Sequence, residues 1–428
     1  MSKFQIILTG IFAVFILAGV FVFAFFGREN SVKSTVLVWG PLPESSFNAI
    51  IAKLPIWDDK NISIKYVNKK AVDFDRDFVE ALASGTGPDV VIISQDNLLR
   101  HRNKLFLVPF ESYSERGYKD NFIEEGEIFL EPTGIIAIPF LVDPLMMYWN
   151  RDIFTASSVA QPPKYWDEFY ELSKTLTKRD NSFNVSKATL PLGEYSNVTN
   201  AKDILATLIF QAGNTEIVKS ENNRYIVTLT KSFGANVNPA TAAVNFYTEF
   251  SNPAKAHYSW NRSLPPSQTL FTSGDLAVYF GFASELPLLK LKNPNLNFDT
   301  ALLPQSRTGD RPATFGRMHG LAVTKSTRSL NGAFTVVSAL SSPQAIDAFA
   351  KSAGLPPVRR DLISKGISEA NQTLFYQSAL WAKGWLDPNA EATNSIFEEL
   401  VESITSGRAR SEQAISLAEQ EISALLPQ

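Results

Sequence analysis

The amino-acid sequence predicts an α/β protein with more than one domain, preceded by a single membrane-spanning helix. Its 428 residues are more than one hydrophobic core usually serves, so at least two domains are expected. Between residues 35 and 96, extended apolar runs alternate with a helical stripe, as in domains built around a parallel sheet. Close to the N-terminus, residues 6–26 carry no charged side chain.

Composition excludes several classes of partner and chemistry. With 45% hydrophobic and 19% charged residues, the chain is globular, and its net charge of −3 offers no basic field for nucleic acid. The chain contains no cysteine, which excludes disulfides, thiolate nucleophiles, cysteine-ligated zinc and a lipid-modified N-terminal cysteine. Its three histidines lie far apart in sequence. We therefore expect neither a metal nor another cofactor.

The uncharged segment 6–26 is long enough for a transmembrane anchor, because about 20 residues span the hydrocarbon core of a bilayer. A secretory signal has an apolar region of only about 7–15 residues and small residues before its cleavage site. Here bulky rings, Phe25 and Phe26, occupy that place. We expect an uncleaved single-pass anchor in the cell membrane, a polar stalk over 27–34, and the globular part outside the cytoplasm.

The first globular stretch has a strand–helix–strand pattern. Alternating or continuous apolar residues predict strands over 35–39, 62–66 and 90–93, and the spacing of Phe74, Phe78 and Leu82 predicts a helix. In open α/β sheets, ligands bind beyond the carboxyl ends of the strands. This places Trp39 and Asp96 on one rim of a predicted cleft.

The segment Gly134–Asn150 is the predicted connection between domains. It contains two extended runs, Ile135–Ile138 and Leu145–Trp149, separated by a bend at Val142–Pro144 that carries Asp143. A strand that leaves one domain, exposes a charge and enters a second domain is typical of a hinge crossover. Two ordinary neighbouring strands joined by a surface turn would give the same pattern.

The rest of the chain continues the alternation of helices and strands. Pro162 and Pro163 precede a helix that contains Trp166, and a polar loop covers 192–197. Further elements are predicted as helices over 201–211, 240–250 and 343–349 and as strands over 277–280, 298–303 and 321–323.

Five segments, in this order, resemble a known family: ALASGTGPDVVIIS, IPFLVDPLMMYWNRDIF, PPKYWDEFYELSKTL, FTSGDLAVYFG and ITSGRARSEQAISLAEQEI. From about residue 35 to the C-terminus they resemble the bacterial extracellular solute-binding proteins of the maltose-binding type (family 1), the receptors of ABC importers. The resemblance implies a two-lobed periplasmic-binding-protein fold of type II. The family's lipid-bearing cysteine is missing here, so the membrane span would replace the lipid.

The resemblance also implies where the lobes divide. The chain would cross between lobes near Val142–Leu145, Asp299–Leu302 and Ser329–Asn331. The N-lobe would then comprise 35–142 plus 303–329, and the C-lobe 145–299 plus 331–428. Lobes of this kind close around a ligand by bending at a hinge.

Candidate ligand-binding residues are those at strand ends and in loops that face the predicted cleft. By motif position, Asp96 falls where the family has a ligand-binding aspartate, and Asp143 falls at the hinge position. Carboxylates and amides bind several hydroxyls at once and an aromatic face covers a sugar ring, so an oligosaccharide is the expected ligand. The full set is Trp39, Glu44, Asp96, Asp143, Glu194, Tyr195, Ser196, Phe282, Ser284, Glu285, Arg317 and Asn394.

Each of these residues also has a structural interpretation. Asp96 could cap a helix starting at Asn97, Asp143 could serve turn chemistry before Pro144, and Trp39 could belong to the core. An acidic cluster is interpreted as a solvated face, comprising Glu124, Glu125 and Glu127.

Three functional classes fit the sequence. The first is a membrane-tethered, non-enzymatic receptor that delivers its solute to an ABC permease. The second is a sensory or adhesive ectodomain with the same fold and no transport role. The third is a glycoside hydrolase with Asp96 and Asp143 as its carboxyl pair. No nucleophile-elbow, zinc-protease, P-loop or dinucleotide-binding motif is present.

Overall fold

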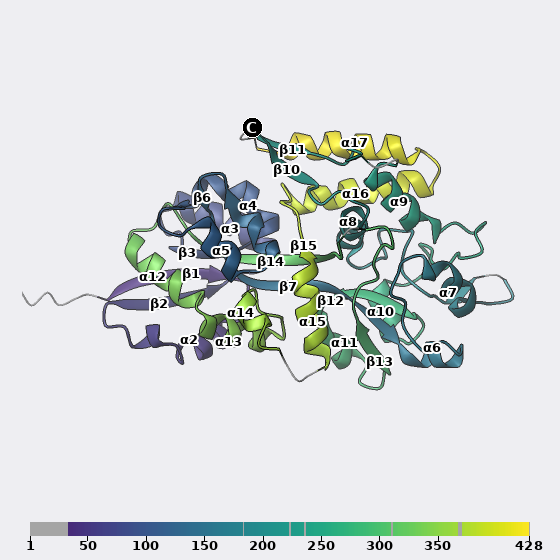
Figure 1. The fold of residues 1–428 in the computed structure, drawn as a ribbon, viewed down its shortest axis with the longest axis horizontal. Coiled ribbons are helices and arrows are strands. Elements are labelled where there is room, and N and C mark those ends of the chain that lie inside the picture. Colours follow the sequence, from purple (N-terminus) through teal and green to yellow (C-terminus); the bar gives the residue numbers. More distant parts are fainter. Residues whose placement is uncertain are drawn as a thin grey trace, which may run out of the picture.

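The computed structural model describes residues 33–182, 184–221, 224–234, 237–309, 311–366 and 370–427. The predicted anchor over 6–26 and most of the predicted stalk lie outside these residues. Over the described part of the chain, no helix has the length and apolarity needed to cross a membrane. Two lobes lie side by side, and β7, β14 and α15 occupy the region between them (Figure 1).

Strands and helices alternate along most of the chain. The strands are β1 (Ser34–Gly40), β2 (Ile62–Asn68), β3 (Val90–Ser94), β4 (Val108–Pro109), β5 (Leu130–Glu131), β6 (Gly134–Ile135), β7 (Ile138–Asn150), β8 (Lys178–Arg179), β9 (Val185–Lys187), β10 (Val218–Glu221), β11 (Arg224–Val227), β12 (Val278–Phe282), β13 (Phe298–Ala301), β14 (Thr314–Val323) and β15 (Ala382–Lys383).

The α-helices are α2 (Glu44–Ile51), α3 (Ala71–Ala83), α4 (Gln95–His101), α5 (Glu115–Asn121), α6 (Arg151–Ala156), α7 (Glu168–Leu176), α8 (Ala201–Gln211), α9 (Pro239–Glu249), α10 (Ser267–Thr272), α11 (Leu286–Lys292), α12 (Leu330–Leu340), α13 (Pro343–Ala353), α14 (Arg360–Ile363), α15 (Ala370–Trp381), α16 (Ala390–Thr405) and α17 (Ser411–Leu425). Short 3₁₀ turns are η1 (Pro55–Asp58), η2 (Arg102–Lys104), η3 (Glu124–Phe129) and η4 (Ala283–Glu285).

One mixed sheet runs through both lobes. Its strand order is β12-β7-β14-β3-β1-β2, with β13 also paired to β7 and β15 to β14. β1 lies parallel to β2 and β3, whereas β14 is antiparallel to both β3 and β7. The apolar run Val90–Ile93 is fully buried, as expected for a strand covered on both faces.

The predicted bend at Val142–Pro144 is wrong, because β7 is one strand that continues through all three residues. Its neighbour β14 pairs Arg317 with Asp143 and Gly316 with Pro144, so the ladder holds the segment extended. Val142 is buried in the core of the N-lobe, and Leu145 is buried in the core of the C-lobe. The same strand therefore belongs to both lobes.

The other two predicted crossings between lobes, near Asp299–Leu302 and Ser329–Asn331, differ from the places where the chain changes core. β13, which contains Asp299, pairs with the C-lobe half of β7, whereas β14 changes core between Phe315 and Met318. The prediction places 331–428 in the C-lobe. In the structure, helices α12 and α13 of this range pack in the N-lobe core. The reason is that their apolar faces, including Val336 and Phe349, are buried with the core around β1 and α2.

Helix α15 contacts both cores, since Phe375 is buried with the C-lobe core and Ala379 with the N-lobe core. Ala382 packs in the N-lobe core, and Trp385 is buried in the C-lobe core. The paired helices α16 and α17 complete the C-lobe and end near the region between the lobes (Figure 1).

Candidate ligand site between the lobes

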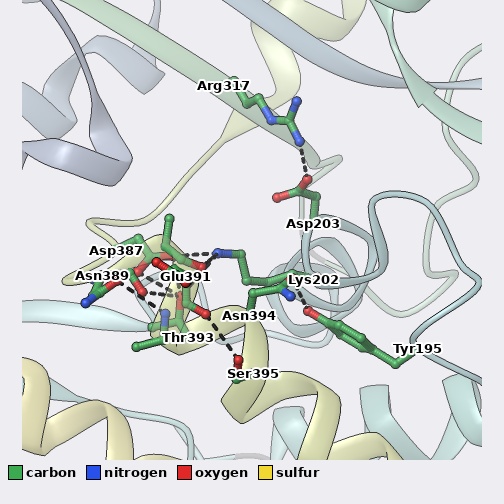
Figure 2. A network of polar contacts seen from close by, with 12 residues as sticks. Tyr195, Lys202, Asp203, Arg317, Asp387, Asn389, Glu391, Thr393, Asn394 and Ser395 are labelled. Carbon is green, nitrogen blue, oxygen red and sulfur yellow. Dashed lines mark hydrogen bonds and ion pairs between the residues drawn. The ribbon is translucent and has the colours of Figure 1, made fainter. Parts of the chain in front are cut away.

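A group of charged and polar side chains lies where the lobes meet (Figure 2). Lys202 at the start of α8 donates from Nζ to Asp387 Oδ2 at 2.7 Å and to Thr393 Oγ1 at 3.1 Å. Arg317 on β14 donates from Nη2 to Asp203 Oδ2 at 2.8 Å. We call this group the interlobe network and define it as Lys202, Asp203, Arg317, Asp387, Thr393 and Asn394.

The start of α8 is set by Asn200, which has a left-handed backbone with φ of 62°. Asparagine tolerates this conformation better than most residues. Its side-chain amide donates to Glu285 Oε1 at 2.9 Å, which ties the turn to the loop after β12. The turn places Lys202 and Asp203 in the first helical turn, where the carboxylate of Asp203 also suits the positive helix end.

Asp96 approaches the interlobe network from the N-lobe. The capping interpretation is wrong, because α4 begins at Gln95 with Ser94 before it, so that Asp96 lies inside the first turn. Its half-buried carboxylate has no hydrogen bond or ion pair with the residues that the structure describes. Burial raises the pKa of Asp96 to about 6, an effect that Lys202 opposes most strongly.

Asp143 lies at the hinge, in the middle of β7, and is only 8% exposed. Its Oδ1 accepts a hydrogen bond from the Ser284 N–H at 3.0 Å. Burial raises the pKa of Asp143 to about 6, although this hydrogen bond and the nearby Arg317 act in the opposite direction. The surface-turn interpretation of Asp143 is therefore wrong.

Arg317 also covers an aromatic ring. Its guanidinium carbon lies 3.6 Å from the ring centroid of Phe282, the last residue of β12. A cation placed in this way is attracted by the negative face of the ring. Arg317 is thus held by an ion pair with Asp203 and by the Phe282 ring together.

The polar loop of the C-lobe adds a second set of contacts. Tyr195 donates from its hydroxyl to Asn394 Oδ1 at 2.7 Å, which joins the loop to α16 (Figure 2). Glu194 is buried and accepts from Arg262 Nη2 at 3.1 Å. Ser196, the next residue, is exposed.

The remaining candidates lie apart from the interlobe network or face inward. The Trp39 ring is buried in the N-lobe core, against Phe78 and under the Nζ of Lys69 at 4.2 Å. Glu44 is exposed at the start of α2. Glu285 accepts hydrogen bonds from Gln268 and Tyr279 of its own lobe, so its carboxylate supports the fold of the C-lobe.

The structure thus brings six predicted residues to the interlobe network or its edge: Asp96, Asp143, Tyr195, Phe282, Arg317 and Asn394. The sequence analysis missed Lys202, Asp203, Asp387 and Thr393. A signal for two of them was present, because the predicted helix over 201–211 opens with a Lys-Asp pair directly after the polar loop. Asp387 and Thr393 carry no comparable signal.

A hollow of about 720 Å³ is lined by both lobes, but by no residue of the interlobe network. The N-lobe contributes residues such as Arg102 and Glu131, and the C-lobe contributes Pro388 and Asn389. Across it, Tyr225 of the β10–β11 hairpin donates from its hydroxyl to Glu131 Oε1 at 3.1 Å. This contact connects the lobes directly.

A second contact region between the lobes corrects the interpretation of the acidic cluster. Glu125 is 4% exposed and accepts from the Gly384 N–H at 2.8 Å, so it is not part of a solvated face. Burial raises the pKa of Glu125 to about 8. Its neighbour Glu124 forms an ion pair with Lys383 at 2.5 Å. Across the described residues, no group of three histidine, cysteine, aspartate or glutamate side chains is arranged to hold a metal ion.

Two α/β lobes that share long strands, with charged groups from both lobes meeting between them, define a two-lobed binding protein. The family model described as bacterial extracellular solute-binding protein matches residues 40–347. The chain belongs to this family, and the resemblance seen in the sequence is confirmed.

Curated relatives are distant. Proteins named "Putative binding protein" from Brucella abortus (strain 2308) and Brucella suis biovar 1 (strain 1330) are each 21% identical over 292 residues. The matched region covers 65% of this chain and 64% of the length of those relatives.

Solved structures with the same fold cover nearly the whole chain. The cyclic alpha-maltosyl-1,6-maltose binding protein from Arthrobacter globiformis has a TM-score of 0.73 at 15% identity, covering 92% of this chain and 99% of that chain. A cyclo/maltodextrin-binding protein complexed with maltotetraose has a TM-score of 0.72 at 15% identity, covering 92% and 98%. A solute-binding protein from Thermotoga lettingae bound with alpha-D-tagatose has a TM-score of 0.64 at 17% identity, covering 92% and 100%. These likenesses confirm the two-lobed α/β fold.

Proposed function

We propose that this protein is a membrane-anchored, extracytoplasmic receptor that captures a small solute, an oligosaccharide, between its lobes and delivers it to an ABC importer. The observation that carries the proposal is that three carboxylates from different elements, Asp96 on α4, Asp143 on β7 and Asp203 on α8, all act on Arg317 of the interlobe network. The family and the neighbouring structures are binding proteins, which supports a receptor without enzymatic activity.

The chemistry of this region suits a polyhydroxylated solute. Asp96 has both carboxylate oxygens free of hydrogen bonds to the described chain, and a carboxylate can accept from several hydroxyls at once. A hydrogen bond to a charged group contributes about 1.5–3 kcal/mol net. Three or four such bonds would leave about −8 kcal/mol after the costs of ordering, which is micromolar affinity.

Support for a carbohydrate comes from the neighbours, whose bound ligands range from alpha-D-tagatose to maltotetraose. Support for the anchor comes from the uncharged segment 6–26, whose length matches a bilayer. Two lobes connected through β7, β14, α15 and the chain that follows α15 fit a receptor that closes by bending at these connections.

The test is a thermal-shift screen of the full chain in a detergent that lacks a sugar headgroup, since a maltoside headgroup could itself occupy the site. The panel contains oligosaccharides, polyols, polyamines, peptides and phosphate esters. A ligand that binds only the folded state raises the melting temperature with concentration. We expect such a rise with one class of sugar and its loss in Asp96→Ala and Asp143→Ala. A flat response to every sugar would contradict the carbohydrate receptor.

A further inference from the structure

The two cations of the interlobe network are already paired within the protein. Lys202 lies 2.7 Å from an oxygen of Asp387, which is fully buried and also accepts from the Thr393 hydroxyl. Arg317 lies 2.8 Å from an oxygen of Asp203. Each pair is neutral, so neither leaves a positive charge for the carboxylates around it.

Two carboxylates next to these pairs have no cation of their own. Asp96 has no ion-pair or hydrogen-bond partner among the described residues, and Asp143 is bonded to the neutral Ser284. Both side chains are withdrawn from water at least in part, and an uncompensated carboxylate is costly in such surroundings. The ligand region therefore has an excess of about two negative charges.

One cation, the guanidinium of Arg317, already lies among these carboxylates in the structure. The guanidinium of Arg317 lies over the ring of Phe282, and the negative charges of Asp203, Asp143 and Asp96 all act on it. A ring face and converging carboxylates are the surroundings that stabilise an organic cation. Since Arg317 covers the Phe282 ring, that face is not open for stacking on a neutral sugar.

A second aromatic face at the same sheet edge is occupied in the same way. Lys69 Nζ lies over the Trp39 ring at 4.2 Å, while Phe78 packs against the ring edge-on. Stacking of a sugar ring on the Phe282 and Trp39 rings is therefore hindered. Hydrogen bonding to charged carboxylates is the stronger contribution that remains.

We infer that the ligand carries a protonated amine on a polyhydroxylated frame, that is, an amino sugar, and that Asp96 and Asp143 receive the ammonium group. The inference rests on the proposed function and narrows it. An ammonium donates hydrogen bonds to a carboxylate and offsets one of the two excess charges, whereas a neutral sugar leaves both in place. An anionic sugar would face repulsion from the same two groups.

The experiment uses the full chain at pH 7 in a detergent without a sugar headgroup. Sugars of the glucose, galactose and mannose series are compared as mono- and disaccharides in matched 2-amino, 2-acetamido and 2-hydroxy forms, and dissociation constants are measured by calorimetry. Spermidine serves as an amine without the sugar frame. We expect the amino form of one series to bind at least about tenfold more tightly than its two neutral counterparts.

Asp96→Asn and Asp143→Asn preserve size and remove charge. In each variant the preference for the amino form should fall below about threefold, because loss of the charge weakens binding of the amino form more than binding of the hydroxy form. Asp120→Asn is the matched control, because Asp120 is an exposed carboxylate on α5. It should retain the full preference.

The outcomes separate the inference from the proposed function. If a neutral form binds as tightly as its amino counterpart, the amino-sugar inference is wrong and the carbohydrate receptor stands. If spermidine binds and no amino sugar does, the polyhydroxylated frame is wrong. If no sugar in any form binds, both the inference and the carbohydrate receptor are contradicted.

Discussion

Two regions join the lobes, and both contain carboxylates whose pKa is raised by burial, yet they are built differently. At the interlobe network, Asp96 and Asp143 lie near the cations Lys202 and Arg317. At the other region, which we call the Gly384 seam and define as Gln95, Glu125 and Gly384, the carboxyl group of Glu125 is enclosed.

The Gly384 seam has no room for a ligand. A Cβ on Gly384 would lie only 2.5 Å from Gln95 Nε2, and it would meet the Glu125 carboxyl group as closely. Gln95 Oε1 accepts from the Met318 N–H at 3.0 Å, which ties α4 to β14. Gln95 Nε2 and Glu125 Oε1 have no partner among the described residues.

The difference shows how a two-lobed protein can use buried carboxylates for two purposes. In the Gly384 seam the neutral, protonated form of Glu125 fits a dry contact that fixes one lobe against the other. For Asp96, beside the interlobe network, burial raises the pKa only to about 6, because the nearby Lys202 and Arg317 act in the opposite direction. The seam is therefore suited to holding the hinge, and the network to binding a solute.

The largest effect is expected from Gly384→Ala, which places a methyl group against Gln95 and Glu125. Overpacking of this kind costs about 1–3 kcal/mol or more in the free energy of unfolding. Urea denaturation of the full chain measures the change. Gly117→Ala is the control, since on this surface helix its Cβ would meet the Ser114 hydroxyl at 3.0 Å and the Tyr113 ring no closer than 3.4 Å. Equal stability of both variants would show that the Gly384 seam is not tightly packed.

A somewhat smaller effect is expected from Glu125→Gln, and it depends on pH. The folded-state pKa of Glu125 is raised from 4.5 to about 8, so the folded state retains a proton that the unfolded state loses. Stability from this group is present below pH 4.5 and is lost as the pH rises through 8. The Gln variant resembles the protonated form and should lack this loss, so its stability relative to the unaltered protein should rise between about pH 5 and pH 9.

Stability curves between pH 4 and 9 for both proteins test this prediction. The Glu124→Gln variant is the control, because Glu124 pairs with Lys383 and its pKa is lowered. Parallel curves for the Glu125→Gln variant and the unaltered protein would show that Glu125 ionises in the folded state as it does in water.

The smallest effect is expected in the interlobe network, from Arg317→Met. This change leaves Asp203 without its cation and should cost about 1–2 kcal/mol, less than a fully buried pair because Arg317 is partly exposed. Asp203→Asn in the same chain should restore part of the loss. A double-mutant cycle from urea denaturation measures the coupling. Additive effects of the two substitutions would show that the ion pair contributes nothing to stability.

The sequence by itself determined the class of the fold and predicted a set of candidate site residues. Local sequence patterns were sufficient to predict β1, β3 and α8, because apolar periodicity and turn residues can be recognised within a few positions. Asp96 is a predicted candidate because it follows an apolar run at a strand end. Asp143 is a predicted candidate because it interrupts an apolar run at the expected bend. The order of the five segments along the chain was specific enough to identify the family.

Only the tertiary structure decided how these pieces meet. The ladder with β14 keeps β7 straight through Pro144, and no local signal could report that pairing. Burial of Glu125 depends on Gly384, which is distant in sequence, so an acidic run was mistaken for a solvated face. The partners of Lys202 and Arg317 likewise come from remote segments. Long-range packing decides which carboxylates are buried and which have a cation as partner. The amino-sugar inference depends on both, so it could be drawn only from the folded chain.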